Sequence, residues 1–114
     1  MSVTIASVDE QIAAGRALVP DHLWTGVREH ILFGRRSGNF LSAAFANDLL
    51  NAATGADEVS FERLPDLMRF LHNYAPYHCW GSRAVRDLWR ELGGVERAAF
   101  EDPRFESLKE AAAA

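Results

Sequence analysis

Three side chains that can bind metal or act in catalysis, His72, His78 and Cys79, lie close together in the sequence. Imidazole and thiolate are common Zn²⁺ ligands, but a site needs three or four donors that converge tetrahedrally. The His-Glu-x-x-His spacing is absent, and no second cysteine is present for a zinc-finger pattern. The cluster therefore assigns no metal and no cofactor, although a metal-binding protein centred on these three residues stays an alternative.

The same cluster could supply a nucleophile, with Cys79 as the attacking thiolate and His78 or His72 as its base. Adjacent residues such as His78 and Cys79 often point apart, and a pairing with His72 depends on the fold. Ser82 is the other candidate nucleophile, but it lacks the Gly-x-Ser-x-Gly pattern of a nucleophile elbow. A small enzyme is therefore kept as an alternative function, and no residue is assigned a catalytic role.

Arginines on one side of a predicted helix over 83–92 open a second alternative, nucleic-acid binding. Arg83, Arg86 and Arg90 follow helical spacing, which is the arrangement of a recognition helix. However, Asp87 lies one turn from both Arg83 and Arg90, a pattern typical of a solvated helix face with local ion pairs. The chain has sixteen acids and twelve bases, with a net charge of -4, so nucleic acid is not the expected partner.

The aromatic side chains favour a third class of function, protein–protein interaction. Three tryptophans occur in 114 residues, and Trp, Tyr and Arg dominate the hot spots of protein interfaces. The same residues could instead close the core of a small domain, where each buries a large area. We expect a non-enzymatic interaction module with a protein partner, and self-association is also open. Its candidate surface consists of aromatic, imidazole and guanidinium side chains: Trp24, Arg35, Arg36, Tyr77, His78 and Trp80.

Length and composition limit the kind of protein that carries these residues. A chain of 114 residues, 48% hydrophobic and 25% charged, has the size and composition of one globular domain. Cys79 is the only cysteine, so no disulfide can form within the chain. The first residues lack the features of a secretory signal, and no apolar run is long enough for a transmembrane helix. A cytoplasmic protein is therefore expected.

Capping residues and apolar periodicity predict an all-α fold, a compact bundle of about five helices joined by short loops. Ser7 and Glu10 have the spacing of a capping box, which predicts that Ser7 caps the first helix. The second helix is predicted from Pro20 to Gly34. The third, predicted over 39–54, is apolar around most of its circumference, so it is expected to lie in the centre of the core.

Two further helices flank the segment 73–82, which holds most of the candidate chemistry. The spacing of the apolar residues predicts one helix over 65–74, and Pro76 ends it because a residue before proline avoids the helical region. Ser82 caps the next helix, over 83–92. The segment 73–82 is therefore expected to be a turn between two helices.

Residues 1–94 are thus expected to form a single helical domain, followed by a helical extension over 95–114 whose terminal alanines fray. Asp48 interrupts the apolar third helix, and a carboxylate there needs partners if it is buried. We expect Asp48 or Asn47 to accept hydrogen bonds from an exposed helix N-terminus or from backbone N–H groups of the 76–82 turn. Trp80 is expected to pack the turn against the third helix.

Several short motifs follow one another over residues 20 to 94: Gly38-Asn39-Phe40-Leu41, Asn47-Asp48-Leu49, Gly55-Ala56-Asp57, Leu64-Pro65, Arg69-Phe70-Leu71, Ala75-Pro76, Cys79-Trp80-Gly81-Ser82, Trp89 and Gly93-Gly94. In this order they resemble a family of small helical proteins of bacteria and their phages or prophages. Members often have Pro-Pro-Gly where this chain has Arg36-Ser37-Gly38, and Asn-Glu-Ala-Pro where it has Asn73-Tyr74-Ala75-Pro76. The second departure removes the one acid that could act beside Cys79. The family has no established activity, so the resemblance implies only a mobile-element protein that modulates a host or phage partner.

Overall fold

The computed structural model describes residues 3–113, and within them the chain forms α-helices and short 3₁₀ turns but no strand. The all-α prediction is confirmed, with eight α-helices in place of about five. The α-helices are α1 (Ile5–Ala13), α2 (Asp21–Phe33), α3 (Asn39–Phe45), α4 (Leu49–Gly55), α5 (Glu58–Glu62), α6 (Leu64–Asn73), α7 (Arg83–Leu92) and α8 (Arg104–Ala113). The 3₁₀ turns are η1 (Arg16–Leu18), η2 (Val95–Arg97) and η3 (Ala99–Glu101). Over this part of the chain, no helix is long and apolar enough to cross a membrane.

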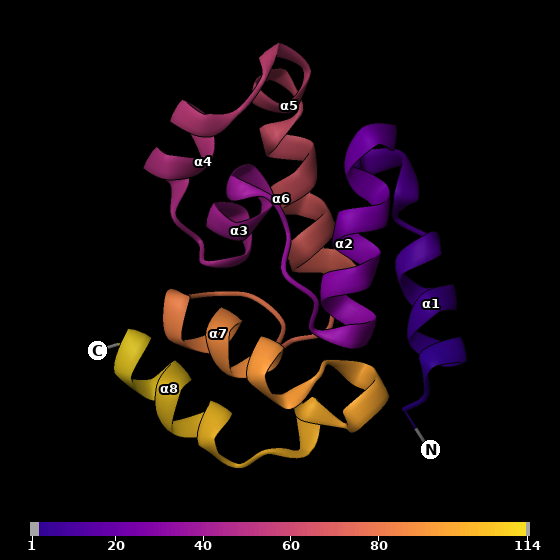
Figure 1. Ribbon diagram of the computed structural model, residues 1–114, viewed down its shortest axis with the longest axis vertical. Coiled ribbons are helices and arrows are strands. Elements are labelled where there is room, and N and C mark those ends of the chain that lie inside the picture. The colour runs from indigo at the N-terminus through magenta and orange to yellow at the C-terminus, as the bar shows by residue number, and fades with distance from the viewer. Residues whose placement is uncertain (1–2, 114) are drawn as a thin grey trace.

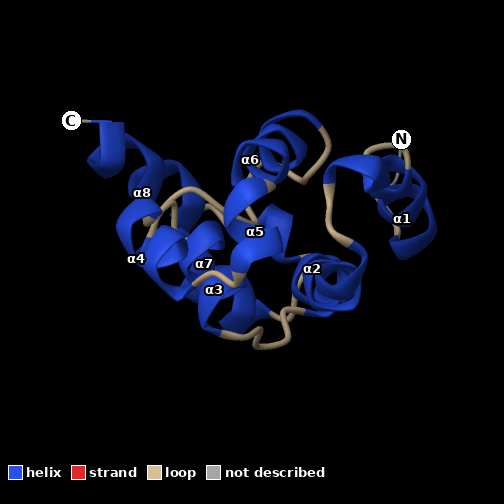
Figure 2. Ribbon diagram, turned by 90° about the horizontal axis from the view of Figure 1, so that it is seen from above, coloured by secondary structure: helices blue, strands red, loops and turns tan. Residues whose placement is uncertain are grey.

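Helix α2 runs through the molecule and is contacted on several sides (Figure 1). α1, α3 and η2 all pack against it, while α8 packs against α7 at the lower end of the view. Seen from above, α1 and α8 lie on opposite sides of the molecule (Figure 2). The core collects fully buried side chains from most of the helices: Ile12, Val27, Ile31, Leu32, Phe45, Leu67, Phe70, Leu71, Val85, Trp89 and Phe105.

The end of α2 is as the sequence predicts and fixes the position of the segment after α7. Gly34 ends the helix in the left-handed conformation, with φ at 68°. Gly94 lies directly against this end, since a Cβ atom on Gly94 would be 2.6 Å from the Gly34 backbone nitrogen. Two glycines therefore let the end of α2 and the chain after α7 approach more closely than any side chain would allow.

The start of α1 differs from the prediction. Thr4, rather than Ser7, is the N-cap: its hydroxyl accepts a hydrogen bond from the Ser7 N–H at 3.0 Å, while Ser7 Oγ accepts one from the Thr4 N–H at 2.9 Å. Ser7 thus takes the third position of the capping box, where Glu or Gln is usual. The prediction is wrong by about one turn because the earlier start lets the helix bury Val8 together with Ile12.

The helix predicted over 39–54 is interrupted, and this is the largest correction to the sequence analysis. α3 ends when Asn47 takes the left-handed conformation, with φ at 54°. The Asp48 N–H then donates to the Ala43 carbonyl oxygen at 2.9 Å, which is the closing bond of a Schellman motif. Asp48 caps α4 by accepting a hydrogen bond from the Asn51 N–H at 3.2 Å, so of the two expected donors the structure shows a helix N-terminus, that of α4 itself. The α3 half buries five residues in the core, whereas α4 buries only Ala52.

The two helices on either side of the 73–82 turn are as predicted. Pro65 lies in the first turn of α6, and α6 ends at Asn73 before the proline of the turn. Ser82 caps α7 by accepting a hydrogen bond from the Val85 N–H at 3.2 Å, and Gly93 ends α7 with φ at 85°. A separate short helix, α5, precedes α6 with Asp57 as its N-cap.

The segment after α7 packs into the same core as the rest of the chain. Val95 and Ala99 are buried, and Phe105 of α8 is fully buried, with its ring centroid 6.2 Å from that of Trp89. The sequence analysis expects the terminal alanines of the 95–114 segment to fray, and Ala114 lies outside the described residues.

Candidate functional site

The 73–82 turn is held in place by buried parts of two other helices. The Gly81 N–H donates to the Phe45 carbonyl oxygen of α3 at 2.9 Å. The Cys79 carbonyl oxygen lies 2.8 Å from His30 Nε2 of α2, and since a carbonyl only accepts, Nε2 carries the proton. Two bonds to the core, one from each neighbouring helix, therefore fix the backbone of the turn.

His30 is a structural residue that the sequence analysis did not single out. Its ring is fully buried and stacks on Phe45, with centroids 3.8 Å apart. Burial lowers the pKa of His30 to about 4, more than the Cys79 carbonyl raises it, so the ring is neutral at pH 7. The feature of the sequence that indicates its burial is its position one turn after Val27, on the apolar side of α2.

Cys79 and the two nearby histidines do not converge on a reaction centre. The Cys79 side chain is fully buried, and burial raises the pKa of its thiol well above the ordinary value. His72 is exposed, while the half-buried His78 ring stacks on Phe105 with centroids 4.8 Å apart. Over residues 3–113, no group of three or more His, Cys, Asp or Glu side chains is placed to hold a metal ion.

Tyr77 is the most exposed large aromatic side chain of the turn, at 74% of its full accessible area. A hollow of ≈ 280 Å³ lies on one side of it, lined also by Leu71 and Trp80. A second hollow of ≈ 490 Å³ is lined by Tyr77 together with Pro76 and Phe100. Tyr77 therefore stands as a ridge between two concave surfaces with apolar residues in their walls.

Helix α8 holds the outer side of the same turn. The Lys109 ammonium donates to the Tyr77 carbonyl oxygen and lies 3.3 Å from the centre of the Tyr77 ring. The edge of Tyr77 also meets His78, with ring centroids 5.2 Å apart. Burial, and then the nearby Lys109 charge, lower the pKa of His78. The position of Tyr77 is therefore fixed from both sides of the turn.

Trp80 packs against the core as expected, but its ring is only half-buried. It lies beside Asn47 at the end of α3, with both residues lining the smaller hollow. A half-buried indole can contribute to the fold and still offer part of its surface to a partner.

The remaining residues of the expected interaction surface lie elsewhere. Trp24 belongs to the core, with 9% of its area exposed and its ring edge against Phe70. Arg35 pairs with Glu29 at 3.1 Å, and Arg36 is exposed in the loop between α2 and α3. The single surface expected from the sequence is therefore wrong for Trp24, which is buried because α2 turns it toward α6.

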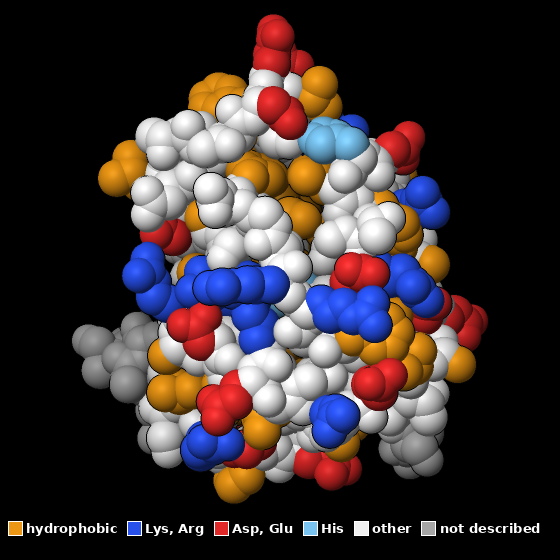
Figure 3. All heavy atoms as spheres, viewed as in Figure 1, with side chains coloured by type: hydrophobic (Ala, Val, Ile, Leu, Met, Phe, Trp, Pro, Cys, Tyr) orange, Lys and Arg blue, Asp and Glu red, His pale blue; other side chains and the backbone are white. Residues whose placement is uncertain are grey.

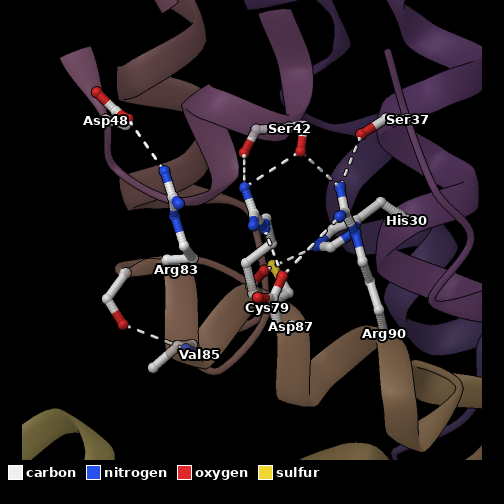
Figure 4. A network of polar contacts seen from close by, with 11 residues as sticks. His30, Ser37, Ser42, Asp48, Cys79, Arg83, Val85, Asp87 and Arg90 are labelled. Atoms are coloured by element: carbon white, nitrogen blue, oxygen red, sulfur yellow. Dashed lines mark hydrogen bonds and ion pairs between the residues drawn. The ribbon is translucent and has the colours of Figure 1, made fainter. Parts of the chain in front are cut away.

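The arginine stripe of α7 is largely used inside the molecule (Figure 4). Arg86 donates to the Ser42 carbonyl oxygen at 3.0 Å, and Arg90 donates to Ser42 Oγ at 3.1 Å. The Arg86 and Arg90 side chains are only 13% and 12% exposed, whereas Arg83 is 70% exposed and lies 3.8 Å from Asp48. Two of the three guanidinium groups thus join α7 to α3 instead of forming a free recognition face.

Comparison of the chain with protein-family models, with curated proteins and with solved structures found no match.

Proposed function

We propose that this protein is a non-enzymatic interaction module that binds a protein partner through the 73–82 turn. The observation that carries the proposal is the position of Tyr77: an exposed aromatic ridge on an anchored turn, with a hollow on each side. Aromatic side chains in such settings dominate binding energy at interfaces. A surface that is already ordered also loses little conformational entropy when a partner binds.

The partner that suits this surface presents apolar side chains to the two hollows and a hydrogen-bond acceptor to the Tyr77 hydroxyl. The resemblance noted in the sequence supports the further proposal that the protein belongs to a bacterium or phage and modulates a host or phage protein. A cytoplasmic location accords with the single free thiol of Cys79.

Parallel affinity capture with three versions of the protein tests the proposal. We expect wild type and Glu91→Ala to retain the same partner, and Tyr77→Ala to lose it, because Glu91 is an exposed residue of α7 outside the turn. The partner is then produced in pure form, and its affinity for Tyr77→Ala is expected to be about tenfold or more weaker than for wild type. Equal affinity for all three versions contradicts a role for the turn.

A further inference from the structure

The two consecutive short helices α4 and α5 expose apolar side chains that a folded domain normally buries. Six large apolar residues are exposed in the part of the chain that the structure describes, and four belong to these two short helices: Leu49, Leu50, Val59 and Phe61, at 63%, 73%, 53% and 57% of their full areas. Scattered single exposed leucines are common and need no explanation. Four in two consecutive elements make this region, residues 48–62 or the α4–α5 lobe, a candidate binding surface.

The break after α3 is the reason for this exposure. In an unbroken helix, Leu49 would follow Leu41 and Phe45 on the face that enters the core. The left-handed Asn47 ends that helix, and α4 then buries Ala52 while Leu49 and Leu50 face solvent. Leaving a leucine exposed forgoes the free energy that burial of its apolar side chain would provide. A partner that covers these side chains would recover that free energy.

The charges of the α4–α5 lobe indicate the chemistry of the partner. Its sequence contains acids and no Lys or Arg: the acids are Asp48, Asp57, Glu58 and Glu62. Asp48 and Asp57 are occupied as helix caps and lie near Arg83 and His22. Figure 3 shows acidic and apolar side chains gathered at the upper end of the molecule over α5, above a band of basic side chains.

Glu58 and Glu62 are the acids of the lobe that are available to a partner. Both are exposed, and neither forms an ion pair within residues 3–113. They flank Val59 and Phe61 along the chain, so carboxylates and apolar side chains are presented together. A partner with Lys or Arg beside apolar residues complements both properties.

We propose that the α4–α5 lobe binds a basic amphipathic segment of a partner protein. Apolar side chains of that segment contact Leu49, Leu50 and Phe61, and its Lys or Arg residues pair with Glu58 and Glu62. Other occupants fit less well. A second copy bound symmetrically would place two acidic lobes against each other, and anionic membranes repel the same carboxylates. The proposal goes beyond the proposed function because it concerns a surface separate from the 73–82 turn.

Binding of a designed peptide tests the proposal directly. The probe is a peptide of about 18 residues with Leu and Lys on opposite faces of a helix, and its control carries Glu in place of every Lys. Calorimetry is expected to show saturable binding of the Lys peptide and none of the Glu peptide. Leu49→Ser with Leu50→Ser is expected to weaken the affinity by about tenfold, as is Val59→Ser with Phe61→Ser. Both pairs are exposed, so thermal unfolding should confirm that the variants fold.

Two controls distinguish binding at the α4–α5 lobe from attraction to the net negative charge of the protein and from binding at the 73–82 turn. Glu58→Lys with Glu62→Lys should abolish binding of the Lys peptide, whereas Glu10→Lys with Glu96→Lys, which changes net charge equally at exposed positions elsewhere, should leave most of it. Tyr77→Ala should bind the peptide as wild type does, so failure of this proposal is distinct from failure of the proposed function.

Three results overturn the proposal. The first is equal loss of binding in the two charge-reversed variants. The second is self-association of wild type, measured by sedimentation, that Leu49→Ser with Leu50→Ser abolishes. The third is binding to anionic phosphatidylserine vesicles that the same variant loses.

Discussion

Two connections between helices, the 73–82 turn and the break after α3, are built in opposite ways. The 73–82 turn is fixed by groups from outside it, through hydrogen bonds from His30 to Cys79 and from Gly81 to Phe45. Its side chains therefore depend on the core for their position.

The break between α3 and α4 is stabilised by hydrogen bonds between residues that are neighbours in the sequence. Asp48 bonds back to Ala43 and forward to Asn51, and within the described part of the chain no buried group of another helix makes a hydrogen bond to Asp48. The consequence is a difference in what each region displays: a supported aromatic ridge at Tyr77, and outward-facing leucines at Leu49 and Leu50. Substitutions of the buried groups that hold the turn should therefore cost stability, while substitutions of the exposed leucines that follow the break should mainly change the surface.

The largest expected effect comes from His30→Ala at the support of the turn. This change leaves a cavity beside Phe45 and an unpaired buried carbonyl at Cys79, so we expect a loss of about 3–4 kcal/mol in the free energy of unfolding. Urea denaturation at pH 7.5 measures it. Leu50→Ala, at an exposed position of α4, should change the same quantity by less than about 0.5 kcal/mol. Similar losses in the two variants would remove the distinction between the regions.

The pH dependence of stability sharpens the same contrast. The pKa of His30 is lowered from 6.5 to about 4 by burial, so the folded state favours the neutral ring. Below about pH 6.5 the unfolded chain takes up a proton on this histidine while the folded protein does not. The free energy of unfolding therefore decreases as the pH falls from 6.5 toward 4, by at most about 3 kcal/mol. Urea denaturation from pH 7.5 to 4 should show this slope in wild type and in His72→Gln, an exposed control, and a smaller slope in His30→Gln. An unchanged slope in His30→Gln would assign it to other groups.

Trp80→Ala should have a smaller effect than the loss of His30. Because the indole is half-buried, we expect about 2 kcal/mol, below the cost of removing a fully buried tryptophan. Tyr77→Ala, at the exposed ridge, should stay within about 0.5 kcal/mol of wild type. Thermal unfolding of both variants measures the difference. An equal loss of stability in Tyr77→Ala and Trp80→Ala would show that the Tyr77 side chain contributes to the core.

Sequence reasoning predicted the turn because its signals are strong. Proline at Pro76 excludes a continuing helix, and Ser82 is a good cap, so both helix boundaries follow from local chemistry. The break after α3 has only weak signals, since Asn tolerates the left-handed conformation without requiring it. The apolar pattern of residues 49–54 then favoured a continuous helix.

The candidate site was predicted only in part for a related reason. Tyr77, His78 and Trp80 could be placed on the turn, but their support by His30 and Lys109 depends on contacts between distant segments. The burial of Trp24 follows from the direction in which α2 packs, which the sequence pattern leaves open at the edge of an apolar stripe.

The smallest expected effect concerns Asn47, and it tests whether the break is a local property of the chain. Asn47→Ala places at φ 54° a residue that adopts the left-handed conformation less readily than asparagine, so we expect a loss of about 1 kcal/mol. Asn47→Gly should stay within about 0.5 kcal/mol of wild type. Urea denaturation of the three proteins, with circular dichroism at 222 nm, makes the comparison. Increased helix content together with unchanged or greater stability in Asn47→Ala would mean that α3 and α4 can merge. Leu49 would then return to the core face, and the α4–α5 lobe would owe its exposed leucines to Asn47 alone.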